Sequence, residues 1–112
     1  MILEFENYRS DLEAIRASVQ AAGEALHIDH LREQIEELTE EMNQPEFWQD
    51  AEHSARVNQR LGGLKRKVSH YEKLLSTADD IEVMMELAQE AEDADMAAEV
   101  GTELASLKEQ AD

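Results

Sequence analysis

The 112-residue sequence has no cysteine, one proline and four glycines, and each scarcity narrows what the chain can be. Without cysteine it has no disulfide framework and no thiolate metal site, which suits a reducing compartment and predicts a cytoplasmic protein. No apolar run approaches the roughly 18 residues of a transmembrane helix, so no membrane contact is expected. The acidic start "MILEFENYRSDLE" lacks the basic region of a signal peptide. The shortage of helix breakers, beside abundant alanine, glutamate and leucine, favours helix over sheet.

Positive charge is also scarce, with 10 basic against 27 acidic side chains and a net charge of −17. Residues 1–50 carry 13 acidic and 3 basic side chains, residues 51–73 carry 2 and 6, and residues 74–112 carry 12 and 1. Because nucleic acid phosphate repels an acidic surface, we expect no DNA partner for the chain as a whole. Only the basic middle segment is suited to approach RNA, and it is equally suited to pair with its acidic neighbours.

Apolar residues recur at three- and four-residue spacing, the pattern of amphipathic helices. The apolar stripes run over residues 5–26, 28–42, 57–78, 81–91 and 97–111. The expected breaks and caps lie at Gly23, Asp29, Thr77 and Asp93. Repeats of seven residues are typical of left-handed bundle packing. We therefore predict one all-α domain over residues 1–112: an elongated antiparallel helical bundle, similar to a three-helix bundle with coiled-coil heptads, whose last arm is split into two short helices.

One eight-residue stretch, "NQPEFWQD", interrupts the helical pattern. Pro45 cannot continue the preceding helix because it lacks an N–H and its ring clashes with the turn before it. Asp50 is placed to cap the next helix. Between them, Phe47 and Trp48 are too apolar for a freely solvated turn. We expect Trp48 to be mostly buried as a plug at the end of the bundle; the alternative is an exposed aromatic docking point.

No group of side chains in the sequence predicts a metal site, a cofactor or catalysis. His27 and His30 lie three residues apart but at a helix break and without a third ligand at metal spacing. The acidic run Glu36, Glu37, Glu40 and Glu41 lacks the alternating oxygens and glycine of a calcium loop, so a solvated helix face explains it. Three methionines of the C-terminal half are expected to fill the core, with a recognition surface as the alternative; they are Met84, Met85 and Met96.

The stretch "LGGLKRK" places two glycines inside a predicted helix. Gly62 and Gly63 point away from the apolar stripe, and they mark either a local weak point or a surface for close approach of a partner. Arg56, Arg60 and Lys67 lie along one flank of that stripe. We expect them to pair across the bundle with acidic residues of the second helix, and contact with a partner or RNA is the alternative. The candidate acidic partners are Glu33, Glu37 and Glu40.

The segment "HIDHLREQIEELTEEMNQPEFWQDAEHSARVNQRL" resembles the N-terminal domain of bacterial class I peptide chain release factor 2. In that family a heptad helix ends in a P-x-F-W-x-D turn, and a second long helix with an apolar stripe follows. The similarity continues through "YEKLLSTADDIEVMMELAQEAEDADM", the family's acidic two-helix segment, and covers essentially the whole chain. The proline–aromatic turn also separates this type from the sister factor, release factor 1.

The resemblance implies a protein that terminates translation at UGA and UAA codons and triggers hydrolysis of the ester between peptide and transfer RNA. Codon reading in the family uses a Ser-Pro-Phe motif and hydrolysis a Gly-Gly-Gln loop, and neither occurs here. The chain is therefore expected to be non-catalytic, without the codon-reading and catalytic domains. The implied partners are the ribosome, at the stalk base of the large subunit, and the class II release factor GTPase.

Periodicity alone supports a second interpretation, a self-standing coiled-coil scaffold or adaptor protein. The downstream open reading frame would separate the two interpretations, because continuation into Ser-Pro-Phe and Gly-Gly-Gln sequences would support the first. As an isolated chain it is expected to be a monomer or a weak homodimer.

Overall fold

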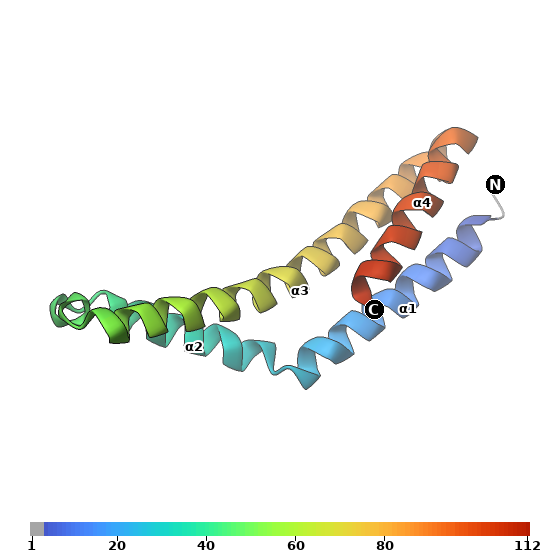
Figure 1. Cartoon of the computed structure of the whole chain (residues 1–112). Coiled ribbons are helices and arrows are strands. Elements are labelled where there is room, and N and C mark those ends of the chain that lie inside the picture. The colour runs from blue at the N-terminus through green and yellow to red at the C-terminus, as the bar shows by residue number, and fades with distance from the viewer. Residues whose placement is uncertain (1–3) are drawn as a thin grey trace. The chain divides into compact units, whose positions relative to one another are not determined.

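The computed structural model describes residues 4–112, which are helical almost throughout and contain no strand (Figure 1). The elements are α1 (Glu4–Ala25), α2 (Ile28–Met42), the 3₁₀ helix η1 (Pro45–Gln49), α3 (Ala51–Ala91) and α4 (Ala94–Ala111). The predicted all-α architecture of packed helices is confirmed. The first three residues of the segment examined for a signal peptide lie outside the described part. None of the described helices combines the length and apolar character needed to span a bilayer.

The helices form two compact units that share α3. We call residues 23–71 the hairpin unit, and we call the rest, up to Ala22 and from Glu72 onward, the bundle unit. The first part of α3 belongs to the hairpin unit and the second part to the bundle unit.

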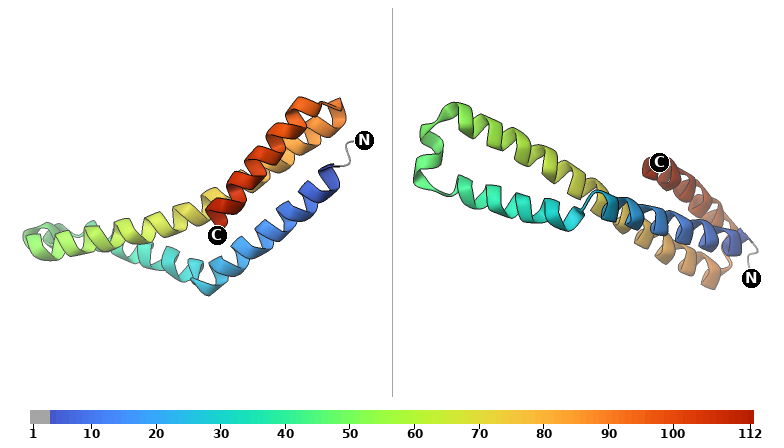
Figure 2. Two further views of the ribbon diagram at one scale, coloured as in Figure 1. Left: turned by 45° about the vertical axis from the view of Figure 1, so that its right-hand side comes forward. Right: turned by 90° about the horizontal axis from the view of Figure 1, so that it is seen from below.

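The bundle unit packs three helices around one apolar core: α1, the second part of α3, and α4, which returns along α3 (Figure 2). Its most deeply buried large side chains are at most 2% exposed and come from all three helices; they include Phe5, Ile81, Met85, Val100 and Leu107. Burial of such side chains contributes about 1.5–3 kcal/mol each, so this core supplies most of the unit's stability.

Polar contacts fix the direction of α1 against α3 in the bundle unit. Arg9 donates to Gln89 (2.8 Å), and Arg16 donates to both Asp79 and Glu82 (2.7 Å each). Rising numbers on α1 meet falling numbers on α3, so the two helices are antiparallel. The hydrogen bond to Glu82, with that to Asp79, raises the pKa of the Arg16 guanidinium above its usual range, and Arg16 stays cationic.

The hairpin unit has two packed helices where the bundle unit has three. Helix α2 runs antiparallel to the first part of α3, and η1 joins them (Figure 2). On α3 the apolar stripe is buried, but on α2 all but the first of the apolar side chains are only partly buried; these are Leu31, Ile35, Leu38 and Met42. A pair of helices covers each apolar stripe from one side only, which explains the partial burial of α2.

The helix ends differ from the prediction at two of four positions. Thr77 lies inside α3, which is continuous, so the last arm is not split into two short helices at that residue. Asp29 lies in the first turn of α2, whose N-cap position is taken by His27. Gly23 lies near the end of α1, as expected, since that helix ends at Ala25. Asp93 does cap α4, because its carboxylate accepts from the N–H groups of Asp95 (3.0 Å) and Met96 (3.1 Å).

The core methionine of α3 is Met85, at 1% exposure, whereas Met84 and Met96 are partly exposed. Leu75, which continues the seven-residue spacing from Val68, is partly exposed, and Leu74 is buried in its place. The spacing is thus interrupted locally after Val68, and the stripe continues through the buried residues Ala78, Ile81 and Ala88.

Candidate functional site

The turn between α2 and α3 is built around Phe47. Helix α2 ends at Met42, and Pro45 opens η1, where its missing N–H costs nothing. Phe47 is 6% exposed, whereas Trp48 is 58% exposed, so the prediction that Trp48 is the buried plug is wrong. The Trp48 ring stands edge-on to Phe47, with centroids 4.9 Å apart, and its Nε1–H donates to the Met42 carbonyl at 3.2 Å. Phe47 therefore anchors the turn, and Trp48 covers it from outside.

A hydrogen-bond network joins the turn to α3. Asp50 caps the helix as the sequence indicated, since its Oδ1 accepts from the N–H of His53 at 3.1 Å. Ser54 is the buried polar residue of the described chain, at 6% exposure, and its hydroxyl lies 2.8 Å from the carbonyl oxygens of both Phe47 and Asp50. Sequence reasoning missed Ser54, although a serine three residues before Val57 on the same apolar stripe could have drawn attention to it.

His53 ties the end of α2 to the start of α3. Its Nε2 lies 2.5 Å from Oε1 of Glu41, and its ring lies edge-on to Phe47 with centroids 5.8 Å apart. No partner for either residue could be predicted from the sequence, because the contact depends on how the hairpin closes. The pair holds α2 and α3 together beside the buried aromatic ring.

Arg56, Arg60 and Lys67 lie one or two turns apart on α3, and we call them the cationic row. In the part of the chain that the structure describes, none of the three forms an ion pair within 4.0 Å, so the expected pairing with α2 is wrong. Arg56 and Arg60 border a pocket of about 380 Å³ between the two helices; its lining is Leu38, Glu41, His53, Arg56, Val57 and Arg60.

Gly62 and Gly63 lie in the middle of this part of α3. Neither has a positive φ. A Cβ on Gly62 would lie 3.3 Å from Nη1 of Arg66, and one on Gly63 would lie 3.8 Å from Nη2 of the same side chain. Within the described residues, neither backbone conformation nor packing therefore requires glycine at these positions.

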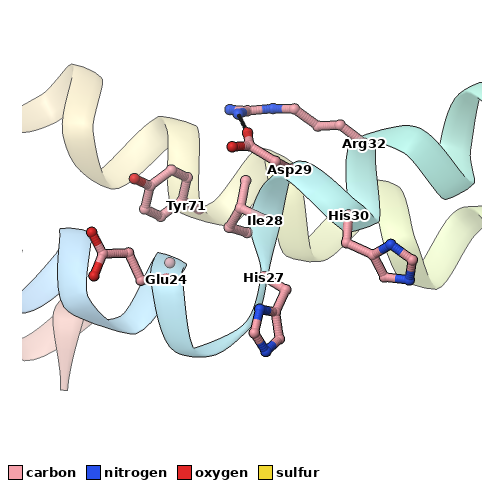
Figure 3. Close-up of a pocket in the computed structure, with 8 residues that line it drawn as sticks. Glu24, His27, Ile28, Asp29, His30, Arg32 and Tyr71 are labelled. Carbon is pink, nitrogen blue, oxygen red and sulfur yellow. Dashed lines mark hydrogen bonds and ion pairs between the residues drawn. The ribbon is translucent and has the colours of Figure 1, made fainter.

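A second pocket, of about 320 Å³, lies at the junction of α1 and α2 within the hairpin unit (Figure 3). His27 occupies the left-handed region (φ 55°, ψ 56°), which turns the chain from one helix into the next. Asp29 accepts from Arg32 at 3.0 Å. Figure 3 shows the rings of His27 and His30 pointing in different directions. Among the described residues, no group of three or more potential metal ligands comes together, here or elsewhere.

The sequence resembles those of known proteins over most of its length. The sequence model of the PCRF domain matches residues 31–112. The chain is 35% identical over 93% of its length to peptide chain release factor 2 of Kineococcus radiotolerans, and 33% identical over 98% to that of an Exiguobacterium species. It covers 28% and 30% of these two relatives. A third relative, peptide chain release factor 2 of Clostridium perfringens, is 30% identical over the whole chain, which covers 30% of it. The chain therefore belongs to the PCRF domain family, as a domain similar to part of bacterial peptide chain release factor 2.

Proposed function

We propose that the chain is the N-terminal domain of a cytoplasmic class I release factor and docks that factor on the ribosome during translation termination. Similarity to release factor 2 over nearly the whole chain carries this proposal. The helical hairpin supports it, because its tip presents Trp48 and its flank presents the cationic row, and both are suited to binding a partner rather than to chemistry.

The finer role rests on the resemblance to the release factor family. We propose that the whole protein acts at UGA and UAA codons and triggers hydrolysis of peptidyl-tRNA. The domain described here contributes contacts with the stalk base of the large subunit and coupling to the class II release factor GTPase. It is not itself an enzyme, since its sequence lacks a Gly-Gly-Gln loop and offers no alternative catalytic group.

A chimera tests this function. Residues 1–112 replace the matching segment of the Kineococcus radiotolerans release factor 2, and release of formyl-methionine is measured on ribosomes programmed with UGA, UAA or UAG. We expect release at UGA and UAA that the GTPase accelerates, and none from the 112-residue chain alone. A folded chimera without activity, or release by the chain alone, contradicts the proposal.

The scaffold alternative gives a different result in sedimentation. A coiled-coil adaptor should form stable oligomers at micromolar concentration and ignore ribosomes. A docking domain should sediment as a monomer or weak dimer and co-sediment with ribosomes.

A further inference from the structure

We propose that the cationic row of α3 binds the phosphate backbone of RNA. This inference rests on the proposed function for the identity of the RNA, since ribosomal RNA is what a domain docked on the ribosome would meet. The contact itself is inferred from the charges and geometry of the hairpin unit.

The first observation is that the residues of the cationic row lack ion-pair partners in the described part of the chain. Two other cations have acidic partners: Arg16 reaches two carboxylates at 2.7 Å, and Arg32 reaches Asp29 at 3.0 Å. In a chain with 27 acidic residues, the cationic row nevertheless has no ion pair within the described residues. Three cations on one face of a helix that have no internal partner favour an external anion.

The spacing of the row suits an extended anion. Arg56 and Arg60 are four residues apart and Lys67 is seven further on, so all three share one face. At 1.5 Å per residue the steps along the axis are about 6 and about 10 Å. A single phosphate or carboxylate would occupy one step only, whereas a nucleic acid strand presents a charge at every nucleotide along the whole row.

Gly63 falls between Arg60 and Lys67 on this same face, by its three- and four-residue spacing. Glycine disfavours a helix interior, and within the described chain nothing packs closely enough to require it. The missing Cβ leaves room at the centre of the row, beside the guanidinium of Arg66, whose Nη2 lies 3.8 Å from the position that a Cβ would take. Glycine allows another backbone to approach the helix closely, because it has no side chain in the way.

Exposed aromatic and apolar groups beside the row favour RNA over an acidic peptide, since guanidinium groups pair in a bidentate fork with phosphate and carboxylate alike. The pocket beside Arg56 and Arg60 has the apolar side chains of Leu38 and Val57 in its lining, and its one carboxylate, Glu41, is engaged by His53. The same hairpin also exposes Trp48, and single-stranded RNA is commonly bound by a basic groove together with aromatic rings on which bases stack. The acidic remainder of the chain repels phosphate and so confines RNA to this flank.

The test measures binding of a fluorescein-labelled 12-nucleotide oligouridine to the 112-residue chain by anisotropy between 50 and 200 mM KCl. The double variant Arg56→Glu/Arg60→Glu is compared with Lys65→Glu/Lys73→Glu, which makes the same charge change at two exposed positions of the same helix off the row. We expect the first to weaken binding at least about tenfold and the second less than about twofold. The logarithm of affinity should fall against the logarithm of salt with a slope of about −2 for three contacts to a single strand.

Circular dichroism checks that each variant is folded. If Arg56→Glu/Arg60→Glu is not, Arg56→Gln/Arg60→Gln replaces it, with an expected loss of at least about threefold. Absence of binding by the unmodified chain at 50 mM KCl, or equal losses in the two double variants, overturns the inference. Competition by polyglutamate at the same charge concentration as RNA also overturns it, in favour of an acidic protein.

The two proposals fail separately. An active chimera together with row variants that bind oligouridine normally would leave the docking function standing and remove the RNA contact. An inactive chimera together with row-dependent binding of oligouridine would remove the termination function and keep the RNA contact.

Discussion

Two neighbouring aromatic residues in η1 have opposite environments, Phe47 buried and Trp48 mostly exposed. The sequence indicates that this short turn needs an apolar anchor, but it does not indicate which ring supplies it. The answer depends on the 3₁₀ geometry, in which successive side chains point about 120° apart because there are three residues per turn. One of two adjacent rings can therefore face the helices while the other faces outward, and ring size does not decide between them.

Removing each ring separately should give unequal losses of stability. We expect Phe47→Ala to lower the free energy of unfolding by about 3–5 kcal/mol, as for other buried aromatic residues. Trp48→Ala should cost about 1 kcal/mol, roughly the value of its hydrogen bond to the Met42 carbonyl. Urea unfolding followed by circular dichroism measures both. Equal losses, or a larger loss for Trp48, would mean that the tryptophan is the anchor after all.

The turn between α1 and α2 requires His27 to adopt a left-handed backbone conformation, at φ 55°. That conformation costs about 1–2 kcal/mol for a residue with a Cβ, whereas glycine adopts it freely and loses about 0.5–1 kcal/mol in chain entropy. We expect His27→Gly to stabilise the protein by about 0.5–1 kcal/mol. The control is His30→Gly, three residues later inside α2, which should destabilise it. Thermal unfolding checks the pair, and a loss in both variants would refute the argument.

At the scale of elements, α3 shows where local sequence signals are overridden. The stretch Thr77–Asp80 contains residues that favour caps, yet the helix passes through it. Ala78 and Ile81 are each 1% exposed, and Asp79 pairs with Arg16 across the bundle unit. Packing of these side chains outweighs the weak local preference for a break. Sequence periodicity therefore predicted the helices well, and their ends less well.

The sequence predicts that the residues of the cationic row share one helix face, but it does not predict whether they form ion pairs. The spacing of Arg56, Arg60 and Lys67 on one face follows from helix geometry alone. Whether a carboxylate of α2 lies within 4 Å depends on the angle and register of the hairpin, which Phe47, Ser54 and the pair of Glu41 with His53 set. Contacts of that kind join residues 7 and 12 positions apart, and no local pattern encodes them.

Replacing either glycine of α3 by alanine should stabilise the helix. Gly62→Ala and Gly63→Ala should each raise the free energy of unfolding by about 1 kcal/mol, because alanine favours the helix and the added Cβ has room. The control is Gly23→Ala, where a Cβ would lie 2.8 Å from Cζ of Tyr71 and should cost about 1–3 kcal/mol. Calorimetry measures the expected gain of stability in the two α3 variants and the expected loss in the Gly23 variant. Destabilisation by either α3 variant would show that glycine has a structural role there.

At the scale of the whole molecule, charge repulsion is the main electrostatic effect. The net charge is −17, and the ion pair of Arg16 with Asp79 and Glu82 is one of few that link different helices in the described residues. Exposed pairs contribute about 0–1 kcal/mol each, too little to offset repulsion among 27 acidic groups. The sequence alone permits this conclusion, since net charge does not depend on the fold.

Salt should therefore stabilise the protein. Raising the ionic strength from about 10 to 150 mM shortens the Debye length from roughly 30 to 8 Å and screens the repulsion. We expect the melting temperature to rise by several degrees, equivalent to about 1 kcal/mol for a domain of this size. The matched control is Glu36→Gln/Glu37→Gln/Glu40→Gln on the exposed face of α2, which removes three negative charges. That variant should melt higher than the unmodified chain at 10 mM salt and gain less from added salt. A fall in melting temperature with salt would instead mean that attractive pairs such as that of Arg16 outweigh the general repulsion.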